Sequence, residues 1–146
     1  MPPFVYRTPI RVSDVDHAGI VYYPRFFHYF HLAFEEFFVA RLGARSYVEL
    51  LDQQRVGFPA VASQCEYREA LRFGDSIDIE MSVERLGGKS VTFRYRIFRI
   101  ADERHPARTL CAEGTNTCAV VNLAEFRAIA IPEDVRGLFS ELLEPG

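Results

Sequence analysis

Residues 14–30 of this 146-residue chain read DVDHAGIVYYPRFFHYF, which places an acidic turn and a glycine directly before an aromatic segment that opens with proline. Proline suits the first turn of a helix because its missing N–H has no helical partner to lose. The unpaired backbone N–H groups of that turn can bind an oxyanion or a polarised carbonyl oxygen. A carboxylate a few residues upstream can attack the same carbonyl or activate water toward it, so the stretch predicts acyl-transfer chemistry.

The aromatic segment predicts one long helix, from Pro24 to about Leu42, with Gly43 as its natural stop. Its phenylalanines fall close to one helical face, and a leucine and a valine make the opposite face apolar as well. A helix that is apolar on all sides is typical of one enclosed by other elements. A shorter helix is expected over residues 46–54, and a last one from residue 132 to about residue 143.

One strand is predicted before the long helix and four after it. Apolar and polar residues alternate on both sides of Gly87-Gly88, a pair that is typical of a hairpin turn. Residues 14–23 are expected to form a turn or loop in which Gly19 can take a positive φ. The order predicts an α+β fold in a single domain over residues 1–146, with an antiparallel sheet covering one helix. The expected strands are 4–13, 57–70, 75–86, 89–102 and 108–122.

The composition argues against several classes of protein. A net charge of −3 gives no reason to expect nucleic acid or an anionic membrane as partner. No apolar run approaches the roughly 20 residues of a membrane span, and the first residues lack a signal-peptide layout, so a cytoplasmic location is expected. Cys65, Cys111 and Cys118 lie in apolar, strand-like runs without CxxC spacing. We therefore expect buried free thiols and no metal site.

The segment 14–24 resembles the active-site segment of the hot-dog-fold acyl-CoA thioesterases, most of all the 4-hydroxybenzoyl-CoA thioesterase branch. The pattern of that branch is roughly Asp-x-Asp-x-x-Gly-[Ile/Val]-Val-[aromatic]-Tyr-Pro. The resemblance implies a five-stranded antiparallel sheet wrapped around a long central helix. It also implies a homo-oligomer, a dimer or a homotetrameric dimer of dimers, with active sites at the subunit interfaces. Shorter matching stretches are Gly57-Phe58-Pro59, Phe73-Gly74-Asp75, Lys89-Ser90 and Ile131-Pro132.

Asp16 is the residue that the resemblance assigns to catalysis, either as nucleophile on the thioester carbonyl or as general base for water. From the residues alone, an aspartate in this loop also fits an Asx turn that leads into the helix. Asp14 is expected to hold the loop through local hydrogen bonds. In the family a backbone N–H polarises the thioester carbonyl, and Tyr23 is the matching position, at the positive end of the helix dipole. Gly19 belongs to the same catalytic segment.

Phe27 and His31 lie on the helix where the family places the acyl end of the substrate. His31 stands where the hydroxybenzoyl branch has an acidic residue, and it is either a contact for a ring substituent or a satisfied core histidine. Phe58 and Pro59, at the start of the second strand, either line the acyl pocket or pack in the core. The aromatic helix surface favours a flat ring as the acyl group, because rings gain from offset and edge contacts.

Coenzyme A carries negatively charged phosphates, so cations are expected at the mouth of the site. Lys89, the only lysine of the chain, and Ser90 follow Gly87-Gly88 at the tip of the predicted hairpin. They match a basic, phosphate-contacting stretch of the family. The alternative is that they are solvated turn residues.

The sequence therefore predicts an acyl-CoA thioesterase that hydrolyses an aromatic, benzoyl-type acyl-CoA to the free acid and coenzyme A. No cofactor is expected, because coenzyme A is part of the substrate. The first alternative is the same chemistry on a short- or medium-chain aliphatic acyl-CoA or on an acyl carrier protein. A non-catalytic acyl-CoA-binding module with this fold is the second alternative, and a dehydratase is a weaker third.

Overall fold

The computed structural model describes residues 2–145. Its main antiparallel sheet is built from β1 (Phe4–Pro9), β3 (Ala60–Tyr67), β4 (Ser76–Leu86), β5 (Ser90–Arg99) and β6 (Thr109–Ala119). The order across the sheet is β1-β4-β5-β6-β3, so β1 and β3 are its edges. Each strand expected from the sequence contributes one strand to this sheet, and β4 and β5 form the hairpin expected at Gly87-Gly88. The five-stranded antiparallel sheet of the hot-dog fold is confirmed.

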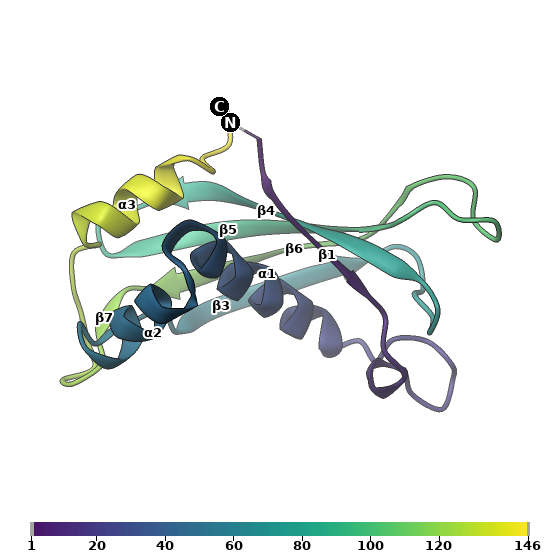
Figure 1. Cartoon of the computed structure of the whole chain (residues 1–146), viewed down its shortest axis with the longest axis horizontal. Helices are drawn as coiled ribbons and strands as arrows, with labels where there is room; N and C mark the ends of the chain where they lie inside the picture. Colours follow the sequence, from purple (N-terminus) through teal and green to yellow (C-terminus); the bar gives the residue numbers. More distant parts are fainter. Residues whose placement is uncertain (1, 146) are drawn as a thin grey trace.

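Helix α1 (Arg25–Leu42) crosses one face of this sheet, as Figure 1 shows. The ring of Phe30 stacks on Tyr95 of β5 with centroids 4.7 Å apart, and Phe34 meets Phe93 edge-on at 5.3 Å. Gly114 of β6 allows this close approach, because a Cβ at that position would lie 2.9 Å from the Phe30 ring. The phenylalanine face predicted from the helical period is therefore the face that binds the helix to the sheet.

Three further helical segments surround this unit. They are η1 (Val12–Asp14), α2 (Ala44–Asp52) and α3 (Glu133–Ser140). The first strand consequently ends at Pro9 and not at residue 13, because a 3-10 turn occupies the interval. Pro24 caps α1 and the helix itself begins one residue later, and α3 ends three residues before the expected Leu143.

Two of the long predicted strands are interrupted. The segment 57–70 divides into β2 (Val56–Gly57) and β3 around Phe58 and Pro59, and proline cannot donate to a strand ladder. The segment 108–122 divides at Val120 into β6 and β7 (Val121–Asn122). With β8 (Arg127–Ala128), β2 and β7 form a small sheet of their own in the order β2-β7-β8.

The two faces of the main sheet differ in chemistry. Side chains that face α1 join one contiguous apolar core, whereas the opposite face carries ion pairs around Arg94, Arg96 and Glu113. This polarity explains the two-residue alternation along β4 and β5. Strand β3 differs from β4 and β5, because all of its residues except Cys65 are exposed.

Two of the three cysteines fit the prediction of buried free thiols. Cys111 and Cys118 are buried and free, and burial raises the pKa of the Cys118 thiol to about 11. Cys65 is also free but only half-buried, because it lies on the exposed edge strand β3. Among residues 2–145, no helix is long and apolar enough to cross a membrane.

Candidate active site

The loop before α1 holds Asp16 in a tight turn. Its backbone N–H donates to the Ile20 carbonyl at 3.0 Å, and its carbonyl accepts from Gly19 N–H at 2.9 Å. Its carboxylate Oδ1 accepts from Ala18 N–H at 2.8 Å, which is the Asx turn foreseen as the structural reading. Gly19 has the expected positive φ of 81°. Asp16 remains exposed to solvent.

The start of α1 offers an unpaired backbone donor. The neighbouring Tyr22 N–H donates to the Asp14 carbonyl at 3.0 Å, and Pro24 has no N–H. Within residues 2–145, the Tyr23 N–H has no hydrogen-bond acceptor. This amide lies at the positive end of the helix dipole, where it can stabilise negative charge on a carbonyl oxygen.

Asp14 holds the loop, as its position in the sequence predicted. It is 6% exposed, accepts from Arg11 N–H at 2.9 Å through Oδ2, and lies 3.2 Å from Arg25 Nε through Oδ1. The hydroxyl of Tyr29 is buried and, within residues 2–145, has no hydrogen-bond partner. Burial and the nearby charge of Asp14 raise the pKa of Tyr29. Both carboxylate oxygens of Asp14 are therefore engaged by groups of the same chain, which leaves Asp16 as the carboxylate available for chemistry.

Asp16 and Tyr23 line adjacent but different hollows of a single chain. Asp16 lines a hollow of about 570 Å³ that also contacts Pro24, Arg25 and His28 at the start of α1. Tyr23 lines a smaller hollow of about 250 Å³, between the loop and the end of β3.

A cavity of about 560 Å³ lies farther along α1, between that helix and the sheet. Four of the predicted substrate-binding residues line it together: Phe27, His31, Phe58 and Pro59. The Phe58 ring meets Phe34 edge-on, with centroids 5.6 Å apart. The side chain of His31 is 58% exposed and its Nε2 lies 3.9 Å from Glu35 Oε1, so it stands at the cavity rim rather than in the core.

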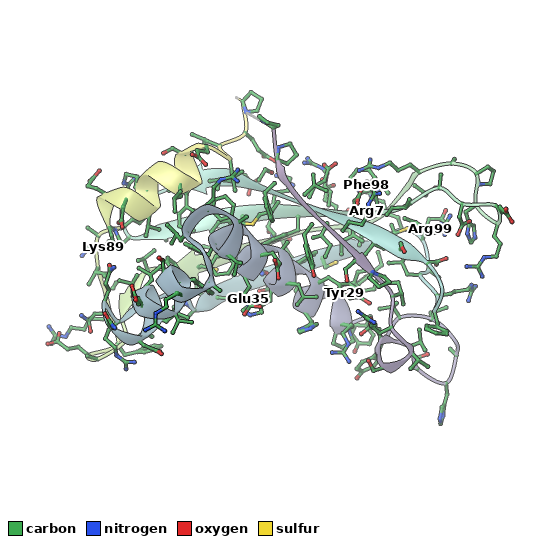
Figure 2. All side chains as sticks on the ribbon, in the orientation of Figure 1. Arg7, Tyr29, Glu35, Lys89, Phe98 and Arg99 are labelled. Atoms are coloured by element: carbon green, nitrogen blue, oxygen red, sulfur yellow. The ribbon has the colours of Figure 1, made fainter. Side chains whose placement is uncertain are left out.

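Lys89 and Ser90 do not join this cavity. Both are exposed at the β4–β5 turn. Lys89 lies at one end of the long axis of the molecule, and the loop before α1 lies at the other (Figures 1 and 2). Arg136 of α3 packs beside the turn and donates to the Gly87 carbonyl at 2.8 Å. Within one chain, therefore, the predicted phosphate contact and the predicted catalytic loop are not brought together.

Several cavity and site residues escaped the sequence reasoning. The cavity wall formed by the sheet includes Ser63, Tyr95 and Asn116, and its rim includes Phe126. The alternation within each strand indicates which residues share a face, but it does not indicate which residues of different strands lie side by side. Tyr67, whose hydroxyl donates to the Tyr23 carbonyl at 3.2 Å, was missed for the same reason.

Asp75, Asp102 and His105 form a cluster with the donor types of a cation site. Their ligand atoms lie within 4.8 Å of one another. Histidine and cysteine spacing gives no sign of this group, because two of its three ligands are carboxylates. Arg104 Nη2 lies 3.5 Å from Asp75 Oδ1, so a guanidinium already compensates the buried carboxylate. The geometry fits an internal ion-pair network.

A sheet curled around one helix, with a carboxylate-bearing loop at the helix start, defines the class expected from the sequence, the hot-dog thioesterases. A family model described as the thioesterase-like superfamily matches residues 10–139, and the chain belongs to this family.

Similar proteins match most of the chain. It is 26% identical over 141 residues to an acyl-CoA thioesterase, YbgC, of Haemophilus influenzae, a match that covers 94% of this chain and 96% of that one. It is 27% identical over 117 residues to a 1,4-dihydroxy-2-naphthoyl-CoA hydrolase of Picosynechococcus sp., which covers 80% and 79% of the two chains. A solved gentisyl-coenzyme A thioesterase is 29% identical with a TM-score of 0.76, over 92% and 98% of the chains.

Proposed function

We propose that this thioester hydrolase acts on acyl-CoA substrates with an aromatic acyl group, with Asp16 as the catalytic carboxylate. The observation that carries the proposal is the aromatic cavity against α1, the helix that begins two residues after the unpaired Tyr23 amide. The acyl ring occupies the cavity, and the thioester carbonyl accepts a hydrogen bond from Tyr23 N–H. A carbonyl held there is polarised as negative charge develops on its oxygen.

Asp16 can act on the thioester in two ways, as a general base or as a nucleophile. As general base it takes a proton from water, the oxygen of that water adds to the carbonyl carbon, and the carbon–sulfur bond breaks. The proton then passes to the coenzyme A thiolate. As nucleophile it forms a mixed anhydride with release of the thiolate, and water cleaves the anhydride. Either route yields the free acid and coenzyme A and needs no cofactor beyond the substrate.

An aromatic acyl group is supported by the rings around the cavity. Phe27, Phe34 and Phe58 present faces and edges to the same space, and offset or edge contacts with a ring are worth about 1 kcal/mol beyond area burial. The similar proteins point the same way, since one is named a naphthoyl-CoA hydrolase and another a gentisyl-coenzyme A thioesterase. A short aliphatic group would leave much of the cavity unfilled.

The working unit in this proposal is a homo-oligomer of one-domain chains, with each site at a boundary between subunits. Strand β3 is an exposed sheet edge, and such edges pair readily with another strand. Lys89 lies at the end of the molecule opposite to the loop before α1 (Figures 1 and 2), so we place the phosphate contact by Lys89 in a site shared by two subunits. The cytoplasmic location remains a prediction.

The test is thiol release from a panel of thioesters. Benzoyl- and phenylacetyl-CoA should exceed acetyl-CoA in kcat/KM by at least about tenfold, which is roughly 1.4 kcal/mol of transition-state discrimination. If an aliphatic acyl-CoA of four to eight carbons, or an acyl carrier protein thioester, is the best substrate, the aryl assignment is wrong. Binding of acyl-CoA without thiol release from any thioester would favour a binding module instead.

The catalytic carboxylate is tested by substitution on the best substrate. Asp16→Asn should retain the fold and lower turnover by at least about a hundredfold, the usual scale for losing a positioned base. Asp14→Asn should lower Tm but retain most of the turnover of the wild type, because Asp14 is buried against Arg25 and supports the loop. Glu103→Gln, at an exposed carboxylate in the β5–β6 loop, is the matched control. Near-normal turnover in Asp16→Asn would refute the assignment.

A further inference from the structure

The turn that joins β7 to β8 contributes two apolar residues to the cavity against α1. The turn, residues 123–126, reads Leu-Ala-Glu-Phe, and both Leu123 and Phe126 line the cavity. Turns of this kind are usually built from glycine, asparagine, aspartate or serine. Phe126 departs from this pattern, and it is 66% exposed. The requirements of a turn therefore do not explain why these two residues are apolar.

The backbone of this turn is strained and firmly held. Phe126 has a φ of 54°, and within residues 2–145 Arg55, at 58°, is the one other residue besides glycine with a positive φ. Leu123 N–H donates to the Arg55 carbonyl and Phe126 N–H to the Asn122 carbonyl, both at 2.6 Å. The Asn122 side chain accepts from two further N–H groups of the turn, at 2.8 and 3.1 Å. Strain of this kind is typical of functional sites, where the surrounding contacts maintain it.

Leu123 is also packed against β2. A Cβ at Gly57 would lie 2.5 Å from Cδ2 of Leu123, so glycine at that position makes room for the leucine side chain. Gly57 itself lines the cavity, next to Phe58. The packing and the hydrogen bonds hold the turn in one place. We therefore treat the turn as a fixed wall and not as a mobile flap.

Helix α1 gives the cavity a direction. Phe27, His31 and Phe34 follow one another along its wall, and at a rise of 1.5 Å per residue the first and the last are roughly 10 Å apart. Tyr23, the proposed donor to the thioester carbonyl, precedes all three. The strand β7 lies at the end of the molecule opposite to the loop before α1 (Figure 1). The turn after β7 consequently closes the cavity at the end that is distant from the thioester.

The cavity is larger than one ring requires. A cavity of about 150 Å³ is enough to bind benzene, whereas this one has a volume of about 560 Å³. An acyl group whose carbonyl lies at Tyr23 can therefore extend beyond a single ring. Each further methylene gains from burial as long as it fits. A group that is too long meets the turn between β7 and β8.

We infer that Leu123 and Phe126 are specificity-determining residues that form the end wall of the acyl cavity and limit the length of the acyl group. The inference rests on the proposed function, because it takes the cavity as the acyl site. The selected substrates are thioesters whose acyl group extends beyond a benzoyl ring and ends at the turn. Because most of Phe126 is exposed, removal of its ring opens the cavity to solvent and leaves no buried void.

The test uses phenylacetyl-, phenylbutanoyl-, phenylhexanoyl- and phenyloctanoyl-CoA, which carry the same ring on linkers of increasing length. In the wild type, kcat/KM should fall by about tenfold or more between two neighbouring members of this series. The fall is expected because methylenes that do not fit an apolar pocket are rejected on this scale. Burial alone would give a continuous rise with length, and such a rise in the wild type would overturn the inference.

Phe126→Gly and Leu123→Ala shorten the wall at two positions. In each variant the kcat/KM of the first rejected thioester, relative to phenylacetyl-CoA, should rise by about tenfold. Phe126→Gly should keep a Tm close to that of the wild type, because glycine adopts a positive φ freely. Leu123→Ala should lower Tm, because it loses packing against Gly57. Glu125→Ala, at an exposed residue of the same turn that does not line the cavity, is the matched control and should leave the length limit unchanged.

A length limit that moves in neither variant would contradict the inference. Size-exclusion chromatography identifies the main alternative for the exposed ring. If Phe126→Gly changes the oligomeric state and the length limit does not move, Phe126 is a subunit contact and the inference is wrong.

Binding measurements separate this inference from the proposed hydrolysis. Unreactive ketone analogues, with a methylene inserted between the carbonyl and the sulfur, should show the same length limit in their dissociation constants and the same shift in both variants. If they do while no thioester is hydrolysed, the proposed function fails and the end wall stands. If aryl thioesters are hydrolysed but neither kcat/KM nor the dissociation constants show a length limit, the proposed function stands and the end wall is refuted.

Discussion

The hydroxyl of Tyr67, at the end of β3, donates a hydrogen bond to the carbonyl of Tyr23 at 3.2 Å. The Tyr67 ring also meets Phe26 of α1 edge-on, with centroids 5.0 Å apart. These contacts join the exposed edge strand to the residue whose amide we propose as the donor to the thioester carbonyl. The position of that amide is therefore set by a strand some forty residues farther along the chain, and not by the loop alone.

Tyr67→Phe should lower kcat by roughly twofold to tenfold with little change in KM, the scale of one hydrogen bond in a neutral pair. The hydroxyl is a reliable donor near neutral pH, because burial and the neighbouring Cys65 raise its pKa to about 12. Steady-state kinetics on the best thioester measure the effect. Tyr6→Phe, which removes a hydroxyl from β1 at the opposite edge of the sheet, serves as control. An equal fall in kcat in both variants would contradict the positioning role of Tyr67.

Asp78 predicts a pH dependence of stability. Arg7 of β1 donates to both of its carboxylate oxygens, at 2.8 and 3.1 Å, and these hydrogen bonds lower the pKa of Asp78. Arg108, whose Nη2 lies 3.7 Å from Asp78 Oδ2, lowers this pKa further. Because the pKa in the folded state lies below the unfolded value, the stabilisation is complete above the unfolded pKa. It is lost as the pH falls through the folded pKa.

Asp78→Asn should consequently lower Tm at pH 7 by roughly 3 °C or more, the scale of a charged hydrogen bond in a chain of this size. The difference from the wild type should shrink as the pH falls below about 4 and vanish below the folded pKa. Thermal melts between pH 7 and pH 2.5 measure it, with Asp52→Asn, at an exposed residue of α2, as the matched control. A Tm difference that grows on acidification would contradict the role given to the ion pair.

Lys89 provides a test of the assembly. Lys89→Ala should raise KM for full acyl-CoA and leave kcat nearly intact, because a distant phosphate contact binds ground state and transition state alike. The effect should weaken in high salt and disappear with a truncated thioester that lacks the nucleotide. Equal losses on full and truncated thioesters would indicate a structural role for the turn.

Mixed oligomers then show which chain supplies the lysine. In a dimer of one Asp16→Asn subunit and one Lys89→Ala subunit, sites shared between subunits include one with both residues intact, and activity with low KM returns. If Asp16 and Lys89 serve the same site from one chain, no such site forms and KM stays high. The separation of Lys89 from the loop before α1 predicts the first result (Figures 1 and 2).

Local sequence determined a large part of this protein. The repeat of Phe26, Phe30, Phe34 and Phe37 predicted α1 and the face it buries, because residues three and four apart share one side of a helix. The two-residue alternation predicted β4 and β5, and the composition of residues 14–24 predicted the turn, the positive φ of Gly19 and a helix start at Pro24, one residue before the observed start. These features depend on neighbours within a few positions, which a single sequence displays.

The tertiary structure decided how distant segments meet. Cross-strand register places Asn116 beside Ser63 within the aromatic cavity, and it brings the Tyr67 hydroxyl to Tyr23. The length and direction of the strands set Lys89 at the end of the molecule opposite to the loop before α1, a separation that the motifs themselves do not reveal. Register and direction follow from how the whole core packs, because a shift of one residue would turn every side chain of a strand to the other face. The helix and the loop carboxylate could therefore be predicted from the sequence, whereas the residues that line the cavity are determined only by the folded sheet.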